Sequence, residues 1–235
     1  INNFDLYQNR KEVTHLYFYG AGCGVESPQH RIRKVFDEIF IHADINIKED
    51  THAAVYAAVE PGEKAIVCIL GTGSNCTYYD GKNIEQRVTS LGYILMDEAS
   101  GNFFGKQLIR SYYFKTMSKE LAREFEKEYD LSPDTIKENI YRKENPNTYL
   151  ATFSKFLIKH KQNDVFQDII AKGLERFINH QILQFENAKE VPIHFIGSIA
   201  FFLEEEINKA LTLNGLTMGT IVKRPIEELV NYHKH

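Results

Sequence analysis

Gly71, Thr72 and Gly73 form the part of this sequence best suited to hold a phosphate group. They follow a short apolar run and precede Ser74 and Asn75. Glycines let backbone N–H groups approach a ligand closely, and small hydroxyl side chains offer further donors to phosphate oxygens. An ordinary hairpin turn is an equally good explanation, because an Asp-Gly turn follows soon afterwards. The pattern alone leaves both interpretations open.

Two aspartates could do acid–base or hydroxyl-binding work. Asp50 stands between a strand-like segment and a helix-forming run of small residues, where a carboxylate can point from the strand end into a cleft. For an aspartate at such a junction, capping of the helix is the commoner role. Asp97 and Glu98 lie among apolar and small residues, a setting unusual for a core, although Asp97 or Ser100 could instead cap the helix that follows.

Composition narrows the class of protein. Of the 235 residues, 43% are hydrophobic and 26% are charged, and the formal net charge of -4 disfavours a nucleic-acid-binding protein, which needs a basic face. No apolar run is long enough to cross a bilayer and no secretory leader opens the chain, so we expect no membrane partner and a cytoplasmic location.

Cys23, Cys68 and Cys76 form no C-x-x-C pair, which predicts reduced thiols. His233 and His235 have no partner at metal-ligand spacing, so we assign them no role and expect no protein-bound metal site.

The elements that must position these residues alternate between strands and helices. Apolar residues at three- and four-residue spacing indicate amphipathic helices, and short continuous apolar runs indicate buried strands. We expect strands over 15–19, 44–48, 65–70, 75–79, 84–89, 191–196 and 216–222, and helices over 29–41, 53–59, 102–114, 118–129, 132–141, 146–160, 164–185, 199–211 and 225–232.

Four of these strands end at residues suited to a ligand site. Three end in small-residue loops at Gly20, Gly71 and Gly197, and a fourth ends at Asp50. In open α/β sheets ligands collect beyond the carboxyl ends of strands, so we expect one cleft lined by backbone donors and a carboxylate. Two nucleotide motifs are excluded, because the sequence has no P-loop and Val25 replaces the third glycine of a dinucleotide fingerprint, with no helix expected to open directly after it.

Four strings in this order resemble the BadF/BadG/BcrA/BcrD-type ATPase and N-acetylglucosamine kinase family: YFYGAGC (17–23), ILGTGSN (69–75), GYILMDEASG (92–101) and HFIGS (194–198). The match spans essentially the whole chain, and the family belongs to the sugar kinase, Hsp70 and actin superfamily. The resemblance implies an α/β fold of two ribonuclease-H-like (actin-like ATPase) lobes, with a mixed sheet in each and a helical insertion in the second. The implied lobes are 1–62 joined by the C-terminal helix 225–235, and 63–224 with the helical segment 102–187.

The resemblance also implies roles on the nucleotide side. Gly71, Thr72 and Gly73 would form the second phosphate loop, and Gly197 and Ser198 would hold the adenosine side. The implied cofactors are ATP and Mg²⁺. Magnesium and backbone amides would neutralise the phosphates during transfer.

On the sugar side, the resemblance makes Asp50 the catalytic carboxylate and Asp97 the acidic residue that grips the substrate. Thr72, Ser74 and Asn75 would lie near the sugar hydroxyls. The expected function is an ATP-dependent kinase of an amino sugar or related hexose, with N-acetylglucosamine as the first choice. The partner is then a small-molecule sugar, and a homodimer is one of the oligomeric states left open.

The sequence departs from the family pattern in two ways. Met96 and Ala99 replace glycines of the usual Gly-Asp-Glu-Gly-Ser-Gly motif; we expect Ala99 to be a small change, and Met96 to matter if its glycine was needed for a positive φ. The first phosphate loop has no match within residues 1–14, so we expect an N-terminal segment to precede Ile1 in the full protein.

Two alternatives remain on the sequence evidence. One is an ATPase activator of an acyl-CoA dehydratase or reductase system, which would need cluster-binding cysteines at a dimer interface. Neither Cys23, in a glycine loop, nor Cys68 and Cys76, near the central strand, has the expected placement. The other is a sugar-binding regulator with weak catalysis, which the change at Met96 and the missing first phosphate loop keep open.

Overall fold

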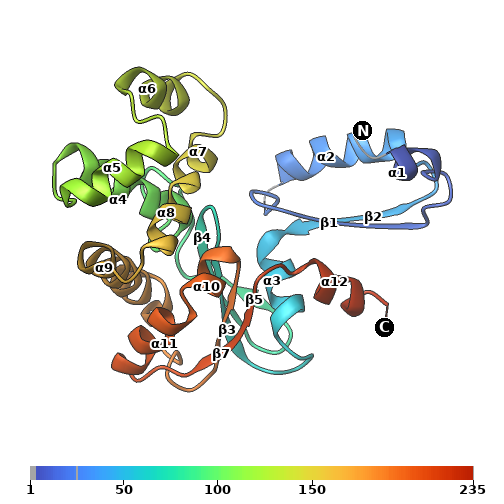
Figure 1. The fold of residues 1–235 in the computed structure, drawn as a ribbon. Coiled ribbons are helices and arrows are strands. Elements are labelled where there is room, and N and C mark those ends of the chain that lie inside the picture. Colours follow the sequence, from blue (N-terminus) through green and yellow to red (C-terminus); the bar gives the residue numbers. More distant parts are fainter. Residues whose placement is uncertain (1–3, 25, 235) are drawn as a thin grey trace.

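The computed structural model describes residues 4–24 and 26–234, which form two β-sheets and the helices around them (Figure 1). One sheet pairs β1 with β2. The other has five strands in the order β5-β4-β3-β6-β7 and mixes parallel with antiparallel pairs. The predicted α/β class with a mixed sheet is confirmed. Among the described residues, no helix has the length and apolar character needed to span a bilayer.

The smaller sheet consists of two parallel strands, β1 (His15–Gly20) and β2 (Asp44–Glu49), in register up to the pair Gly20 and Glu49. Helices α1 (Phe4–Gln8) and α2 (Glu26–Ile39) lie along one side of it (Figure 1). Two apolar side chains of β2, Ile45 and Ile47, are buried there with Cys23. The helix α2 begins at Glu26, so the expectation that no helix opens there was wrong: a proline in the first turn, here Pro28, costs no helical hydrogen bond.

The five-stranded sheet is built around β3, the predicted central strand. Its six residues alternate between two cores: Ile66, Cys68 and Leu70 face the large helical layer, whereas Ala65 and Val67 face α3. A strand covered on both faces needs apolar residues throughout, which explains the uninterrupted run. The strands are β3 (Ala65–Leu70), β4 (Ser74–Tyr79), β5 (Ile84–Glu85), β6 (Ile193–Ile196) and β7 (Met218–Val222).

Helices α3 (Asp50–Ala58) and α12 (Ile226–Tyr232) lie between the two sheets in Figure 1. Tyr56 of α3 stacks on Tyr232 of α12 at 4.3 Å between ring centroids. Directly after α12, His233 lies 2.8 Å by Nε2 from the hydroxyl of Tyr19. His233 therefore does have a role, since it ties the end of the chain to β1, while His235 lies outside the described residues.

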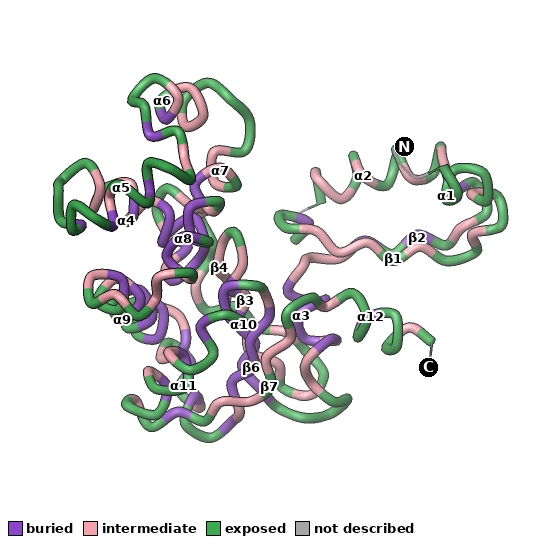
Figure 2. Tube along the Cα trace, in the orientation of Figure 1, coloured by how far each residue is buried: buried purple, intermediate pink, exposed green. Residues whose placement is uncertain are grey.

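The remaining helices cover the other face of the five-stranded sheet and enclose the largest core, which appears in purple in Figure 2. Seven phenylalanines are almost fully buried in this core: Phe104, Phe125, Phe153, Phe156, Phe166, Phe177 and Phe195. The elements are α4 (Gly101–Tyr113), α5 (Lys119–Glu128), α6 (Pro133–Tyr141), α7 (Pro146–Thr152), α8 (Ser154–Lys159), α9 (Asp164–His180), a 3₁₀ turn (Ile182–Gln184), α10 (Ser198–Phe202) and α11 (Glu204–Leu213).

Three helices that were predicted as continuous are broken, and the one over 164–185 ends at His180, before a separate 3₁₀ turn. The helix predicted over 146–160 divides at Phe153, and the one over 199–211 divides at Leu203. Both residues at the breaks are buried. An apolar residue at a break continues the apolar spacing, so the pattern cannot reveal the change of direction.

Candidate functional site

Residues 71–73 form the turn of a hairpin between β3 and the antiparallel strand β4. The N–H of Gly71 donates to the carbonyl of Gly73 over 3.0 Å and closes the turn. Within the described part of the chain, the N–H groups of Thr72 and Gly73 donate to no acceptor. The hairpin interpretation is therefore confirmed, and this hairpin keeps free the two backbone donors that an anion site requires.

A second glycine turn lies directly against this hairpin. Because β3 and β6 are parallel neighbours, Gly197 at the end of β6 lies beside Leu70 and Gly71. Gly197 has a φ of +120°, and a Cβ there would lie 2.4 Å from the carbonyl oxygen of Leu70. Both the conformation and the space demand glycine. Ser198 then begins α10 at the same edge of the sheet.

A pocket of about 270 Å³ opens where these two turns meet. Gly71, Thr72 and Ser198 line it, as do residues that the sequence analysis did not select, which come from α7, α8 and α10: Thr148, Thr152, Ser154, Lys155 and Phe202. Nothing in the sequence marks these positions, because α7 and α8 have the composition of ordinary amphipathic helices. The pocket brings together residues from both predicted glycine loops.

Asp97 lies against Gly73 of the hairpin and does not line this pocket. It is only 8% exposed and has a φ of +68°. A Cβ added at Gly73 would lie 2.7 Å from Asp97 Oδ2, so the absence of a side chain at Gly73 allows the carboxylate to approach. Asn102 Nδ2 donates to the same oxygen over 2.9 Å. The structure thus brings Asp97 against the hairpin but outside the 270 Å³ pocket.

The first turn of α4 holds the hairpin in place. The N–H groups of Gly101 and Asn102 donate to the carbonyls of Gly71 and Thr72 over 2.8 and 3.0 Å. Ser100 caps the helix by accepting from Phe103 N–H at 3.2 Å, so Ser100, and not Asp97, is the capping residue. The first amides of this helix are therefore used by the hairpin, and not by a ligand.

The positions that replace family glycines differ from expectation. Ala99, which we expected to be a small change, has a φ of +57° and is buried. Met96 is not in the left-handed region, and its Sδ accepts from Leu91 N–H at 3.4 Å. The positive φ that we considered for Met96 is found instead at Ala99, and also at Asp97. Left-handed conformations disfavour any Cβ, so the backbone strain lies at these two residues.

Asp50 is the first residue of α3, and the capping position is Glu49. Asp50 is thus not the N-cap residue, although its carboxylate does accept from first-turn amides, as the capping explanation expected. A short connection, residues 59–64, joins α3 to β3, so α3 runs antiparallel to the strand on which it packs and its first residue lies toward the end of the sheet that carries Gly71. Burial raises the pKa of the Asp50 carboxyl, although the N–H groups of Thr51 and Asp50 oppose this rise.

The loop after β1 lies beside Glu49, the residue that precedes Asp50. Gly20 pairs with Glu49, and a Cβ at Gly24 would lie 2.8 Å from Glu49 Oε2. Burial, and then the negative charge of Asp50, raise the pKa of Glu49. The four predicted strand ends therefore meet in two pairs: Gly20 with Asp50, and Gly71 with Gly197.

Ser74 and Asn75 follow the hairpin on β4, and neither lines the 270 Å³ pocket. Asn75 Oδ1 accepts from Gln86 Nε2 at 2.6 Å and from Cys76 N–H at 2.8 Å. Its oxygen is therefore already used, which leaves the amide Nδ2 as the group available to a ligand.

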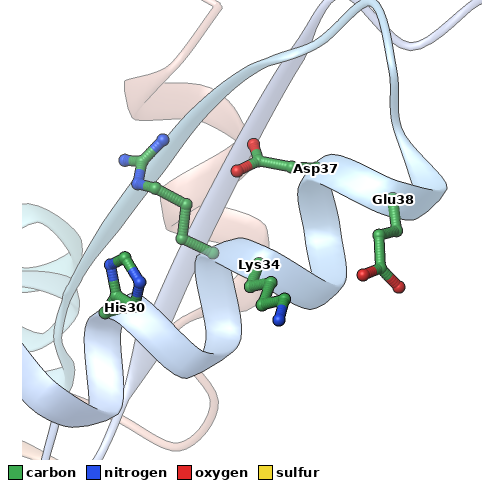
Figure 3. Close-up of a pocket in the computed structure, with 5 residues that line it drawn as sticks. His30, Lys34, Asp37 and Glu38 are labelled. Atoms are coloured by element: carbon green, nitrogen blue, oxygen red, sulfur yellow. The ribbon is translucent and has the colours of Figure 1, made fainter.

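A separate pocket of about 320 Å³ lies on α2 and shares no residue with these loops (Figure 3). Its lining comes from one helix and carries both signs of charge: His30, Arg33, Lys34, Asp37 and Glu38. We do not assign it to the site.

Comparison with solved structures shows what this fold resembles. A candidate N-acetylglucosamine kinase from Porphyromonas gingivalis matches with 35% identity and a TM-score of 0.89, over 96% of this chain and 79% of that one. A candidate N-acetylglucosamine kinase from Chromobacterium violaceum matches with 17% identity and a TM-score of 0.64, over 91% and 75% of the two chains. A glucokinase of the ROK family from Streptomyces griseus, in complex with glucose and AMPPNP, matches with 14% identity and a TM-score of 0.53, over 86% and 70%.

The last two similarities show a shared fold only, because their sequence identity is low. No family model and no curated protein matches the sequence. The first match is 35% identical over an alignment that covers 96% of this chain. The chain therefore belongs to the N-acetylglucosamine kinase family, among the sugar kinases with an actin-like ATPase fold.

Proposed function

We propose that the protein is an ATP-dependent sugar kinase whose acceptor is an amino sugar or related hexose, with N-acetylglucosamine as the first substrate to test. One observation carries this proposal. Gly71 and Thr72 of the hairpin line a pocket with Ser198, whereas Gly73 lies against the buried carboxylate of Asp97, which is outside that pocket. A phosphate bound to the hairpin would thus separate a nucleotide site from a hydroxyl-binding carboxylate, which is the arrangement that phosphoryl transfer to an alcohol needs.

The proposal includes two lobes, 1–62 with the C-terminal helix 225–235, and 63–224. The two separate sheets support this division. So does the return of the chain end to the smaller sheet, where His233 contacts Tyr17 and Tyr19 of β1. Closure of such lobes would exclude water, which otherwise competes as phosphoryl acceptor.

On the nucleotide side, MgATP would bind as a substrate. The free N–H groups of Thr72 and Gly73 would donate hydrogen bonds to its phosphate oxygens, and adenosine would lie toward Gly197 and Ser198. Lys155 would add a positive charge at the rim of the same pocket. The magnesium ion would arrive with ATP and neutralise the phosphate charge.

On the sugar side, Asn102 donates to one oxygen of Asp97, Oδ2. The other carboxylate oxygen would accept a hydrogen bond from a sugar hydroxyl. Asp50 would take the proton of the attacking sugar hydroxyl. The oxygen of that hydroxyl would bond to the γ-phosphorus as ADP leaves. The burial-raised pKa of Asp50 makes it a stronger base than an exposed carboxylate. Thr72, Ser74 and Asn75 would complete the hydroxyl contacts.

The electron-transfer alternative receives no support from the cysteines. All three are buried, and Cys68 and Cys76 face each other across β3 and β4 with their sulfurs 3.5 Å apart. The weak sugar-binding regulator retains one supporting observation, the strained backbone at Ala99 beside Asp97.

One assay separates these functions. The full-length protein is incubated with MgATP and a panel of hexoses and N-acetylated amino sugars, and sugar phosphate is quantified. Transfer to an amino sugar that disappears in Asp50→Asn supports the kinase. Sugar binding by calorimetry without any transfer supports the regulator, and a brown, oxygen-sensitive protein supports the electron-transfer ATPase.

A further inference from the structure

Asn102 connects the two halves of the candidate site. It is the second residue of α4 and is 0% exposed. Its side-chain amide donates to the carbonyl of Thr72 over 2.7 Å and to Asp97 Oδ2 over 2.9 Å. One planar amide group thus joins the phosphate hairpin to the acidic loop.

We propose that Asn102 is a positioning residue that fixes Asp97 relative to the hairpin, and hence the sugar hydroxyl relative to the phosphate. This inference rests on the proposed function. A primary amide carries two N–H donors, and here both have an acceptor. Rotating the amide by half a turn would place its oxygen against two acceptors, so the orientation is determined.

The geometry leaves Asp97 little freedom in either direction. On one side the carboxylate occupies the space that a side chain at position 73 would fill, since a Cβ there would lie 2.7 Å from Asp97 Oδ2. The amide of Asn102 prevents the carboxylate from moving away. Asp97 also has a strained backbone, with a φ of +68°, so its conformation depends on such contacts.

The side chain of Asn102 can be tested without removing the start of α4. Ser100 still caps the helix, and the backbone N–H groups of Gly101 and Asn102 still hold the hairpin carbonyls. The oxygen Oδ1 of Asn102 is buried and has no partner among the described residues, so all that the side chain contributes is its two donated bonds. Truncation therefore removes the link between Thr72 and Asp97 and little else.

The test compares Asn102→Ala with the unmodified full-length protein. We expect the sugar KM to rise and kcat to fall, together lowering kcat/KM by about 10- to 100-fold, because Asp97 loses its fixed position. ATP affinity, measured by equilibrium titration, should stay within about twofold, since the hairpin keeps its backbone anchors. A purely structural role would instead weaken both ligands together.

A matched control is Asn214→Ala, which also removes a side-chain amide that donates to a backbone carbonyl, that of Ala210, but at the far end of α11. It should leave the kinetics unchanged. If Asn102→Ala fails to fold, Asn102→Leu keeps a similar volume and branching and removes the donors without adding a charge, and the same comparison applies to it.

The outcomes separate this inference from the proposed function. Sugar kinetics within about twofold of the unmodified protein in a folded Asn102 variant would overturn the inference alone. Equal losses of ATP and sugar binding would also overturn it. Absence of transfer by the unmodified protein to every sugar tested contradicts the proposed function, and is seen before any variant is made.

Discussion

Gly197 approaches Leu70 so closely that a Cβ on Gly197 would lie 2.4 Å from the Leu70 carbonyl oxygen. This approach brings the ends of two parallel strands, β3 and β6, together at one edge of the sheet. The candidate nucleotide pocket depends on it, because Gly71 and Ser198 line that pocket from the two sides of the contact.

Gly197→Ala should therefore destabilise the protein by more than about 2 kcal/mol, since the new Cβ adds a steric overlap to a φ that only glycine adopts readily. Chemical denaturation measures the change. The control is Gly215→Ala, where φ is also positive but no atom lies within 4 Å of the new Cβ. Equal losses in the two variants would show that the contact with Leu70 does not matter.

Gly73→Ala and Gly71→Ala should affect different ligands. A Cβ at Gly73 would lie 2.7 Å from Asp97 Oδ2, whereas one at Gly71 would meet no atom of the described residues within 4 Å. We expect Gly73→Ala to raise the sugar KM by about 10-fold or more by displacing the carboxylate. Gly71→Ala, whose methyl group adjoins the pocket, should change ATP affinity instead. Steady-state kinetics with each substrate varied in turn tests both expectations. A weaker affinity for ATP in Gly73→Ala and for the sugar in Gly71→Ala would contradict the roles given to the two glycines.

Asp50→Asn should lower kcat by about 10²- to 10⁴-fold, the usual contribution of a general base. At neutral pH the same variant should be more stable than the unmodified protein. The folded-state pKa of this carboxyl is raised, so ionising it reduces stability as pH rises from its ordinary value through the raised one. Thermal unfolding should show the stability difference shrinking as pH falls below the ordinary carboxyl value. A variant that loses both activity and stability at neutral pH would contradict this account.

The pH dependence of kcat/KM should also reflect the raised pKa of Asp50. Asp50 must be ionised to accept a proton, and burial raises its pKa above that of an ordinary aspartate. The acid limb of the profile should therefore lie above the ordinary aspartate range. It should also move little with salt, because burial and not a surface charge causes the shift. An acid limb that moves strongly with ionic strength would assign the shift to another cause.

Ala99→Gly should stabilise the protein by about 0.5–1 kcal/mol, because relief of left-handed strain exceeds the added entropy of glycine in the unfolded chain. Met96→Gly, in contrast, should bring no gain, since Met96 is outside the left-handed region. Urea denaturation of the two variants tests the difference. A gain at Met96 and none at Ala99 would contradict the backbone geometry.

The sequence predicts the fold well where local chemistry determines it. The uninterrupted run 65–70 becomes the central strand because both of its faces are covered. Ser118 and Ser132 accept hydrogen bonds from the first turns of α5 and α6, as residues at predicted helix starts should. These features depend only on neighbouring residues, so a single sequence reveals them.

Other features depend on segments distant in the sequence and were missed. Asn102 looks like an ordinary polar residue at a helix start, and its importance appears only when Thr72 lies opposite, 30 positions away. Likewise, Thr148 and Lys155 reach the pocket only through the packing of α7 and α8 on α4. The roles of Asp50, Asp97 and the glycine turns as ligand-binding residues stay predictions that the variants above can test.

The bond between Tyr19 and His233 spans 214 positions in the chain. On the ribosome, β1 is therefore made long before the helix that covers its aromatic side. Synthesis at roughly 5–20 residues per second would leave Tyr17 and Tyr19 uncovered for tens of seconds. A nascent chain with such a surface is a natural client for chaperones, and stalled translation before α12 would release a product whose smaller sheet lacks its cover.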